Sequence, residues 1–210
     1  PTRRFKRMGG HIAGVVYDLI PISHPHACDE AVVASFRSWF RQYFAVTDLT
    51  VGISQATASS VEAFAAEQER AGSVVRRTPV SHFHLGSELD LIDPRQEPRP
   101  SFRAVFQTDR HVFLAVGTIE PRKNHRLMLD ALDQHWRDGG EATLLLVGKQ
   151  AWKTEDLISR IERHPEKGRR LFLIRDASDE ELDYAYRNAS ALVIASEIEG
   201  FGLPVVEAFQ

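Results

Sequence analysis

Hydrophobic residues change their spacing repeatedly along the chain. Short, wholly apolar runs alternate with longer segments in which apolar residues recur every three or four positions. Such runs are typical of buried parallel strands, and the second spacing is typical of amphipathic helices. The predicted strands are 12–18, 49–53, 80–85, 111–116, 142–147, 171–174 and 191–195. The predicted helices are 29–44, 54–70, 123–137, 154–163, 178–188 and one in which Pro204 occupies the first turn.

Local capping signals support several of these helix starts. Asp29 and Ser54 each precede an apolar-periodic segment and can accept hydrogen bonds from the free backbone N–H groups of a first turn. Ser178 and Glu181 have the spacing of a capping box. Strand–helix alternation of this kind predicts an α/β fold whose parallel sheets are covered on both faces.

One segment interrupts the alternation. Residues 93–101 contain three prolines and four charged residues, a composition typical of an interdomain linker. The chain has 210 residues, which allows one large domain or two small ones. We therefore expect one domain in residues 1–92 and a second in residues 102–210.

Composition narrows the function classes. The chain is 43% hydrophobic and 26% charged, which excludes a disordered chain, a collagen and a coiled coil. Its formal net charge of -3 gives no electrostatic footprint for nucleic acid, so no nucleic-acid partner is expected. A single cysteine, Cys28, cannot form an internal disulfide and fits a reducing cytoplasm. The apolar runs are far shorter than the ~20 residues that span a bilayer.

Ligands of parallel α/β sheets bind at the carboxyl ends of the strands. In the turn that begins at Gly117, Pro121 is expected to start a helix, which would put Arg122 and Lys123 in its first turn. Two cations are poorly placed at a helix N-terminus unless an anion such as a phosphate binds there. The alternative is a solvated basic pair with no ligand.

A second turn at the carboxyl edge contains paired acids. Glu199 and Glu207 are separated by seven residues and could face one crevice, where carboxylates accept hydrogen bonds from sugar and ribose hydroxyls. The alternative is that acidic residues simply favour a helix N-terminus. Taken alone, this spacing does not distinguish the two.

The two turns together resemble a known family. GTIEPRKNH at 117–125, followed about 80 residues later by EGFGLPVVEA at 199–208, resembles the donor-binding half of the retaining GT-B glycosyltransferases of family 4, glycosyl transferases group 1. Segments VVYDLIPISHP, ISQATASSVEAF and HLGSELD resemble the family's first half. The resemblance implies two Rossmann-like domains, an acceptor-side one and a donor-binding one. Both are expected to be incomplete here, with sequence missing at each end.

The resemblance also implies residue roles. Arg122 and Lys123 would hold the donor diphosphate and Glu199 would contact the sugar, and these three would be the catalytic set. Tyr17 and Asp18 would lie on the acceptor side. The donor-binding residues would be Gly117, Thr118, Lys149, Gly200, Phe201, Gly202, Leu203 and Glu207. Two positions depart from the usual pattern, since many relatives have Arg at the position of Thr118 and His at that of Tyr17.

The implied activity is transfer of a hexose from a nucleotide diphosphate sugar to a glycan or lipid-linked acceptor, with retention of configuration. The closest pattern is that of bacterial enzymes of O-antigen or capsule synthesis, which favours mannose and GDP-mannose. No cofactor is expected, and no metal, since the chain has no Asp-x-Asp pattern. The basic residues within 3–7 could contact anionic lipid at the inner face of the cytoplasmic membrane, or form a solvated helix end.

Two other functions stay open on the sequence. A nucleotide-sugar epimerase of the same fold would change the donor sugar without an acceptor. An inactive fragment or scaffold would bind nucleotide without turnover. The donor base, the sugar, the acceptor, the linkage and the oligomeric state are not determined by the sequence.

Overall fold

The computed structural model describes residues 2–72, 78–86 and 96–209. The chain divides into two compact units: Pro1–Gly86 with Ile198–Gly202, and Ser87–Glu197 with Leu203–Gln210. We call them the N-terminal unit and the C-terminal unit and describe each by itself. The domain boundary predicted at residue 92 lies outside the described residues and stays a prediction.

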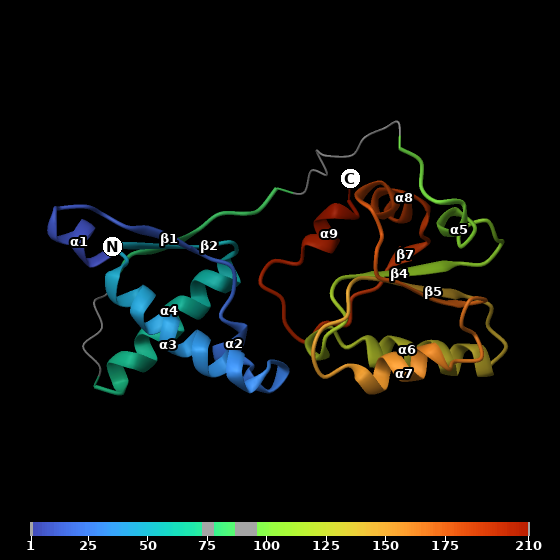
Figure 1. Ribbon diagram of the computed structural model, residues 1–210, viewed down its shortest axis with the longest axis horizontal. Helices are drawn as coiled ribbons and strands as arrows, with labels where there is room; N and C mark the ends of the chain where they lie inside the picture. Colours follow the sequence, from blue (N-terminus) through green and yellow to red (C-terminus); the bar gives the residue numbers. More distant parts are fainter. Residues whose placement is uncertain (1, 73–77, 87–95, 210) are drawn as a thin grey trace. The chain divides into compact units, whose positions relative to one another are not determined.

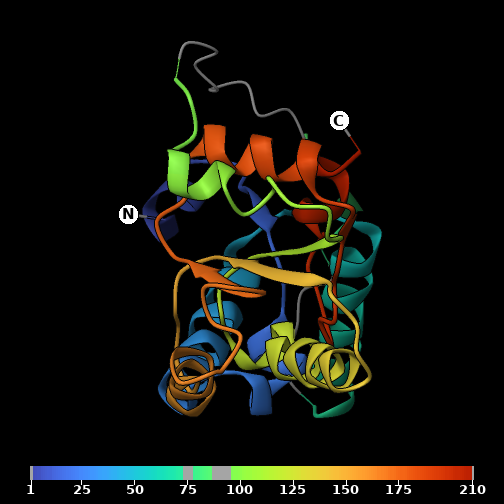
Figure 2. The same cartoon turned by 90° about the vertical axis from the view of Figure 1, so that its right-hand side faces the viewer.

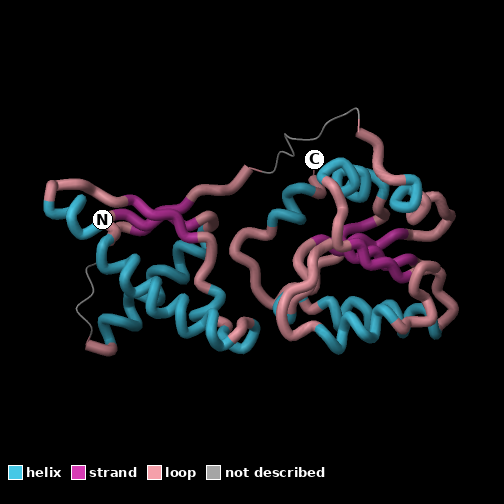
Figure 3. The backbone as a smooth tube through the Cα atoms, viewed as in Figure 1, coloured by secondary structure: helices cyan, strands magenta, loops and turns pink. Residues whose placement is uncertain are grey.

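The N-terminal unit is built on a parallel sheet of order β1-β2-β3 (Figure 3). Its strands are shorter than predicted, because the apolar stretches in the sequence extend beyond the residues that pair with a neighbouring strand. The strands are β1 (Ala13–Val16), β2 (Leu49–Gly52) and β3 (Val80–His82). The helices are α1 (Thr2–Arg7), α2 (Ile20–Ser23), η1 (Pro25–Ala27), α3 (Glu30–Val46) and α4 (Gln55–Arg70).

Aromatic packing joins α3 and α4 to one face of this sheet (Figure 1). Phe40 and Phe44 of α3 meet Phe64 of α4, and the Phe40 and Phe64 rings make an edge contact at 5.0 Å. Val16 of β1 points into this core, whereas Val15, on the opposite face, is exposed. Coverage of both faces was predicted. In the part of this unit that is described, α3 and α4 cover one face only.

The helix starts follow the capping signals. The Asp29 side chain accepts from the backbone N–H of Ala31 at 2.9 Å and begins α3. The Ser54 hydroxyl accepts from the backbone N–H of Thr57 at 3.0 Å and begins α4. Both predicted N-caps are confirmed.

The C-terminal unit contains a four-stranded parallel sheet of order β6-β5-β4-β7. Its strands are β4 (Val112–Val116), β5 (Thr143–Val147), β6 (Leu171–Ile174) and β7 (Ala191–Leu192). Its helices are α5 (Pro100–Arg103), η2 (Pro121–Lys123), α6 (His125–Arg137), α7 (Glu155–Glu162), α8 (Asp179–Asn188) and α9 (Leu203–Glu207).

Helices cover both faces of this second sheet, as predicted. The sheet lies between α6 and α7 on one side and α5 and α8 on the other (Figures 1 and 2). Alternate residues of the wholly buried strand β5 serve the two cores: Leu144 and Leu146 pack with α6 and α7, whereas Leu145 packs with α8. No helix in the described ranges is long and apolar enough to cross a membrane.

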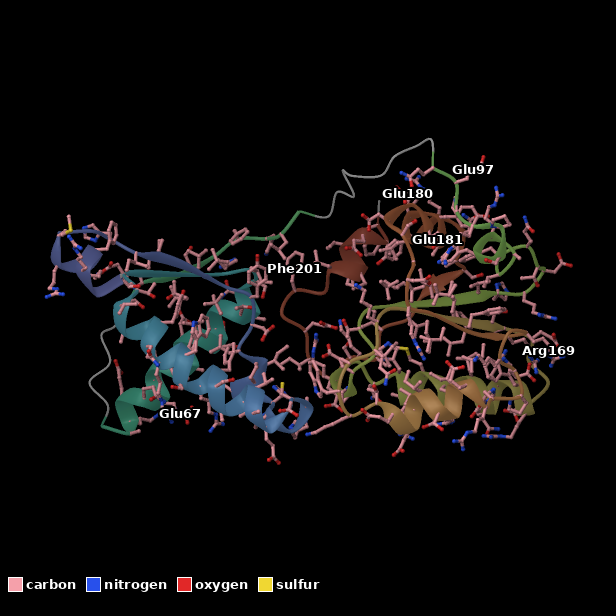
Figure 4. All side chains as sticks on the ribbon, in the orientation of Figure 1. Glu67, Glu97, Arg169, Glu180, Glu181 and Phe201 are labelled. Atoms are coloured by element: carbon pink, nitrogen blue, oxygen red, sulfur yellow. The ribbon has the colours of Figure 1, made fainter. Side chains whose placement is uncertain are left out.

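The end of the predicted linker is part of the C-terminal unit. Arg99 contacts Glu181, a carboxylate that is only 2% exposed on α8 (labelled in Figure 4). Glu181 also forms the predicted capping box with Ser178, which accepts from the Glu181 backbone N–H at 3.2 Å. The guanidinium of Arg99 lowers the pKa of Glu181 and keeps its carboxyl ionised.

Candidate functional site

The turns after β4 and β5 lie side by side at the carboxyl edge of the sheet. The backbone N–H of Ile119 donates to Lys149 O at 2.8 Å, and the N–H of Ala151 donates back to Ile119 O at 3.0 Å. A Cβ at Gly148 would lie 2.0 Å from Gly117 O, so the close approach requires glycine there. The turn that begins at Gly117 and the turn that contains Lys149 are therefore held together by backbone contacts.

Arg122 and Lys123 do not occupy the first turn of an α-helix. They lie in the 3-10 turn η2, and Asn124 then adopts a left-handed conformation with φ of 52° before α6 begins at His125. A residue with positive φ cannot continue a right-handed helix, and asparagine tolerates that conformation better than most residues. The helix predicted over 123–137 is present but begins at His125, so Arg122 and Lys123 precede it. The argument that placed these two cations in its first turn therefore does not hold.

Each of the two cations nevertheless has a defined position. Arg122 Nη2 lies 2.7 Å from Oε1 of Glu120, a carboxylate that is itself buried. The end of the Lys123 side chain passes beside Gly117, where an added Cβ would be 3.4 Å from both Cε and Nζ. Gly117 has a φ of 138°, which also favours glycine. The Lys123 ammonium thus lies next to the half-buried backbone of Gly117 at the end of β4.

A buried histidine directly follows this turn. His125 is 2% exposed, and its Nδ1 has no hydrogen-bond partner in the described part of the chain. Burial, and secondarily the charge of Lys123, lowers the pKa of His125 to about 4, so the imidazole is neutral at physiological pH. This residue could not be predicted from the sequence, since its burial depends on how α6 packs.

The predicted ribose ligand Glu207 is bound by a tyrosine. Tyr186 Oη of α8 donates to Glu207 Oε2 of α9 at 2.6 Å. Burial, reinforced by the Glu207 carboxylate, raises the pKa of Tyr186, so the phenol stays protonated. This role of Tyr186 could not be predicted from the sequence, because 21 residues separate it from Glu207 without any repeating pattern.

The glycine-containing loop at 198–202 belongs to the N-terminal unit. Gly200 O accepts from Ser54 Oγ at 2.6 Å and from Thr57 Oγ1 at 3.2 Å. A Cβ at Gly200 would lie 2.6 Å from Tyr17 O and 3.2 Å from Cβ of Asp18, so the two predicted acceptor-side residues flank this glycine.

The neighbours of this glycine are also defined. The Phe201 ring (labelled in Figure 4) lies 6.0 Å from that of His84, and Gly202 has a φ of 90°. Asp18 itself accepts from the backbone N–H of Ile20 at 3.0 Å.

The predicted site residues are distributed over both units. Gly117, Thr118, Lys123 and Lys149 lie at the paired turns of the C-terminal unit, and Glu207 pairs with Tyr186 in the same unit. Glu199 belongs to the N-terminal unit and Glu207 to the C-terminal unit. A common crevice for the two glutamates stays a prediction.

Solved structures with the same arrangement of elements define the class of fold. Trehalose 6-phosphate synthase from Burkholderia multivorans aligns with a TM-score of 0.70 at 14% identity, over 99% of this chain and 51% of the other. Anabaena HepE, solved in complex with UDP and glucose, aligns with a TM-score of 0.64 at 17% identity, over 99% and 52%. The predicted GT-B fold is confirmed.

Sequence comparison defines the family. The model of the family "Glycosyl transferases group 1" matches residues 97–210, more than half of the chain, and the protein belongs to this family. The serotype-specific mannosyltransferase WbdA of Escherichia coli is 34% identical over 204 residues, which are 96% of this chain and 25% of WbdA.

A second relative matches a shorter stretch. The O-antigen chain mannosyltransferase B of Escherichia coli is 37% identical over 100 residues, which are 45% of this chain and 25% of that protein. The chain spans about a quarter of the length of each of these relatives.

Proposed function

We propose that the protein transfers a hexose from a nucleotide diphosphate sugar to a glycan or lipid-linked acceptor, with mannose as the sugar and GDP-mannose as the donor. The observation that carries this proposal is the Lys123 ammonium beside Gly117 at the paired turns. A cation beside a glycine at the carboxyl end of a parallel strand is suited to bind a diphosphate. Two relatives whose names specify mannosyltransferases support the choice of sugar.

The chemistry requires stabilisation of a leaving group. Breaking the bond between C1 of the sugar and the phosphate oxygen builds negative charge on the diphosphate and positive charge on the sugar ring. Lys123 and Arg122 would stabilise the departing diphosphate, and preorganised charges of this kind are worth several kcal/mol. Glu120 would hold the Arg122 guanidinium in place before the donor arrives.

The other residues have assigned roles in the proposal. Glu199 and the backbone of 200–203 would contact the sugar, and Glu207 would accept hydrogen bonds from the ribose hydroxyls. Gly117 would line the phosphate pocket, Thr118 would contact the donor beside it, and Lys149 would approach the base. Tyr17 and Asp18 would face the acceptor.

The proposal also covers stereochemistry. The reaction would proceed with retention, the donor phosphate taking the acceptor proton, without a cofactor, a metal or a protein nucleophile.

Single substitutions in the full-length protein test the site. Lys123→Ala or Glu199→Ala should lower transfer from GDP-mannose at least a hundredfold, as loss of about 3 kcal/mol of transition-state stabilisation would. Lys167→Ala is the matched control, because Lys167 pairs with Glu162 on the surface after α7, away from the paired turns. Near-wild-type transfer by Lys123→Ala would overturn the assignment. Conversion of the donor sugar without an acceptor would identify an epimerase instead.

We further propose a cytoplasmic location with α1 against the inner face of the membrane. Arg4 and Arg7 of α1 are exposed. Phe5 of the same helix is 52% exposed, and Met8, directly after the helix, is 77% exposed. Cations beside exposed apolar groups suit an anionic lipid surface. Co-sedimentation with phosphatidylglycerol vesicles should exceed that with phosphatidylcholine vesicles and fall for Arg4→Glu. Equal sedimentation with both would contradict the proposal.

A further inference from the structure

Helix α9 is joined to α8 by a side-chain bond. Glu207 is the last residue of α9, and none of the described residues of this helix is buried. Tyr186 Oη of α8 donates to Glu207 Oε2 at 2.6 Å, so the carboxylate is held relative to α8.

Helix α8, which carries Tyr186, is firmly anchored. Its start is fixed by the capping box of Ser178 and Glu181, and the Glu181 carboxylate also binds Arg99. One turn further along, Ala185 is fully buried against the sheet. Tyr186, the next residue, therefore lies on a part of α8 that is held firmly in place.

The bond also defines the direction of the carboxylate. A protonated phenol donates one hydrogen bond, and that bond occupies Oε2 of Glu207. With Oε2 held, rotation of the carboxylate is restricted, and Oε1 can accept from a ligand hydroxyl. A carboxylate positioned in this way before the ligand arrives loses less side-chain entropy when the ligand binds.

We propose that Tyr186 is a positioning residue for the donor nucleotide: it orients Glu207 so that the carboxylate receives the ribose hydroxyls. The inference rests on the proposed function, which assigns the ribose to Glu207. It adds a residue that touches neither substrate and acts through another side chain. Its signature is a loss of discrimination between ribose and deoxyribose, which a general loss of stability would not produce.

The test is binding of GDP and 2′-deoxy-GDP to the full-length protein by calorimetry. The wild type should bind GDP more tightly than the deoxy form. Tyr186→Phe removes only Oη and should weaken GDP binding about tenfold, the usual effect of losing a hydrogen bond to a charged group, while 2′-deoxy-GDP binding changes little. Tyr184→Phe is the matched control on the same helix, since the Tyr184 ring packs edge-on against Phe106 at 5.5 Å.

A double-mutant cycle separates positioning from stability. If Tyr186 acts through Glu207, Tyr186→Phe should have no further effect on GDP affinity in a Glu207→Ala background. Unchanged preference for GDP in Tyr186→Phe, or additive losses in the double variant, would overturn the inference while leaving the proposed function intact. If the wild type bound neither GDP nor UDP, the proposed function would fail, and this inference with it.

Discussion

The Arg99 guanidinium grips the buried Glu181 carboxylate through two parallel bonds, Nε to Oε1 at 2.6 Å and Nη2 to Oε2 at 2.8 Å. The backbone N–H of Arg99 donates to the same carboxylate at 3.1 Å, and Arg99 Nη1 donates to Asp176 Oδ2 at 2.9 Å. This forked ion pair joins the chain directly before α5 to the start of α8, although the two residues are 82 positions apart in the sequence.

The first prediction concerns this fork. Arg99→Ala should lower the melting temperature of the full-length protein, because Glu181 would keep its buried charge without its main partner. Arg103→Ala is the control: Arg103 pairs at 2.9 Å with the exposed Glu97, and such surface pairs contribute little. Adding Glu181→Gln to Arg99→Ala should recover part of the loss. Equal melting temperatures for the two arginine variants would contradict the prediction.

The second prediction concerns pH. The pKa of His125 is about 4 in the folded protein, below its ordinary value of 6.5, so folding favours the neutral imidazole. Its contribution is fully present above pH 6.5 and is lost as the pH falls from 6.5 towards 4, by about 3 kcal/mol in the free energy of unfolding.

Denaturant unfolding at pH 7 and at pH 4.5 measures this loss. His125→Leu cannot titrate, so it should show a shallower decline between the two pH values than the wild type. His111→Gln, at an exposed histidine of the same unit, should decline as the wild type does. A parallel decline in wild type and His125→Leu would show that His125 is not the group responsible.

The third prediction separates steric clash from backbone strain at the paired turns. Gly148→Ala should weaken GDP binding at least tenfold, because the new Cβ would lie 2.0 Å from Gly117 O and push the turns apart. Gly139→Ala is the control: Gly139 has a φ of 88°, yet an added Cβ meets nothing within 4 Å. The control should cost about 1 kcal/mol of stability and leave GDP affinity unchanged. The prediction fails if both variants bind GDP like the wild type.

Signals within one turn of chain were readable from the sequence. Asp29, Ser54 and the Ser178–Glu181 pair begin their helices where predicted, because an N-cap depends only on residues two or three positions away. The alternation of apolar strands and amphipathic helices likewise predicted the parallel sheets, and the turn motifs predicted the family.

Relationships set by packing were not readable. Asn124, with a φ of 52°, interrupts what Pro121 led us to predict as a single helix. Arg99 lies in a stretch whose prolines indicate a linker, yet its partner is 82 positions away. The roles of Tyr186 and His125 depend on how α8 and α6 pack. The sequence pattern at neither position predicts that packing.

The short backbone ladder between the two turns has a practical consequence for protein engineering. Ile119 pairs with Gln150 as a parallel bridge beyond the ends of β4 and β5, with hydrogen bonds to Lys149 and Ala151 on either side. Segments 117–120 and 148–151 therefore form one structural unit and should be exchanged together. A chimaera that takes one segment from a relative without the other would combine two turns whose backbones do not match. Loop grafts at this site are therefore best made as pairs.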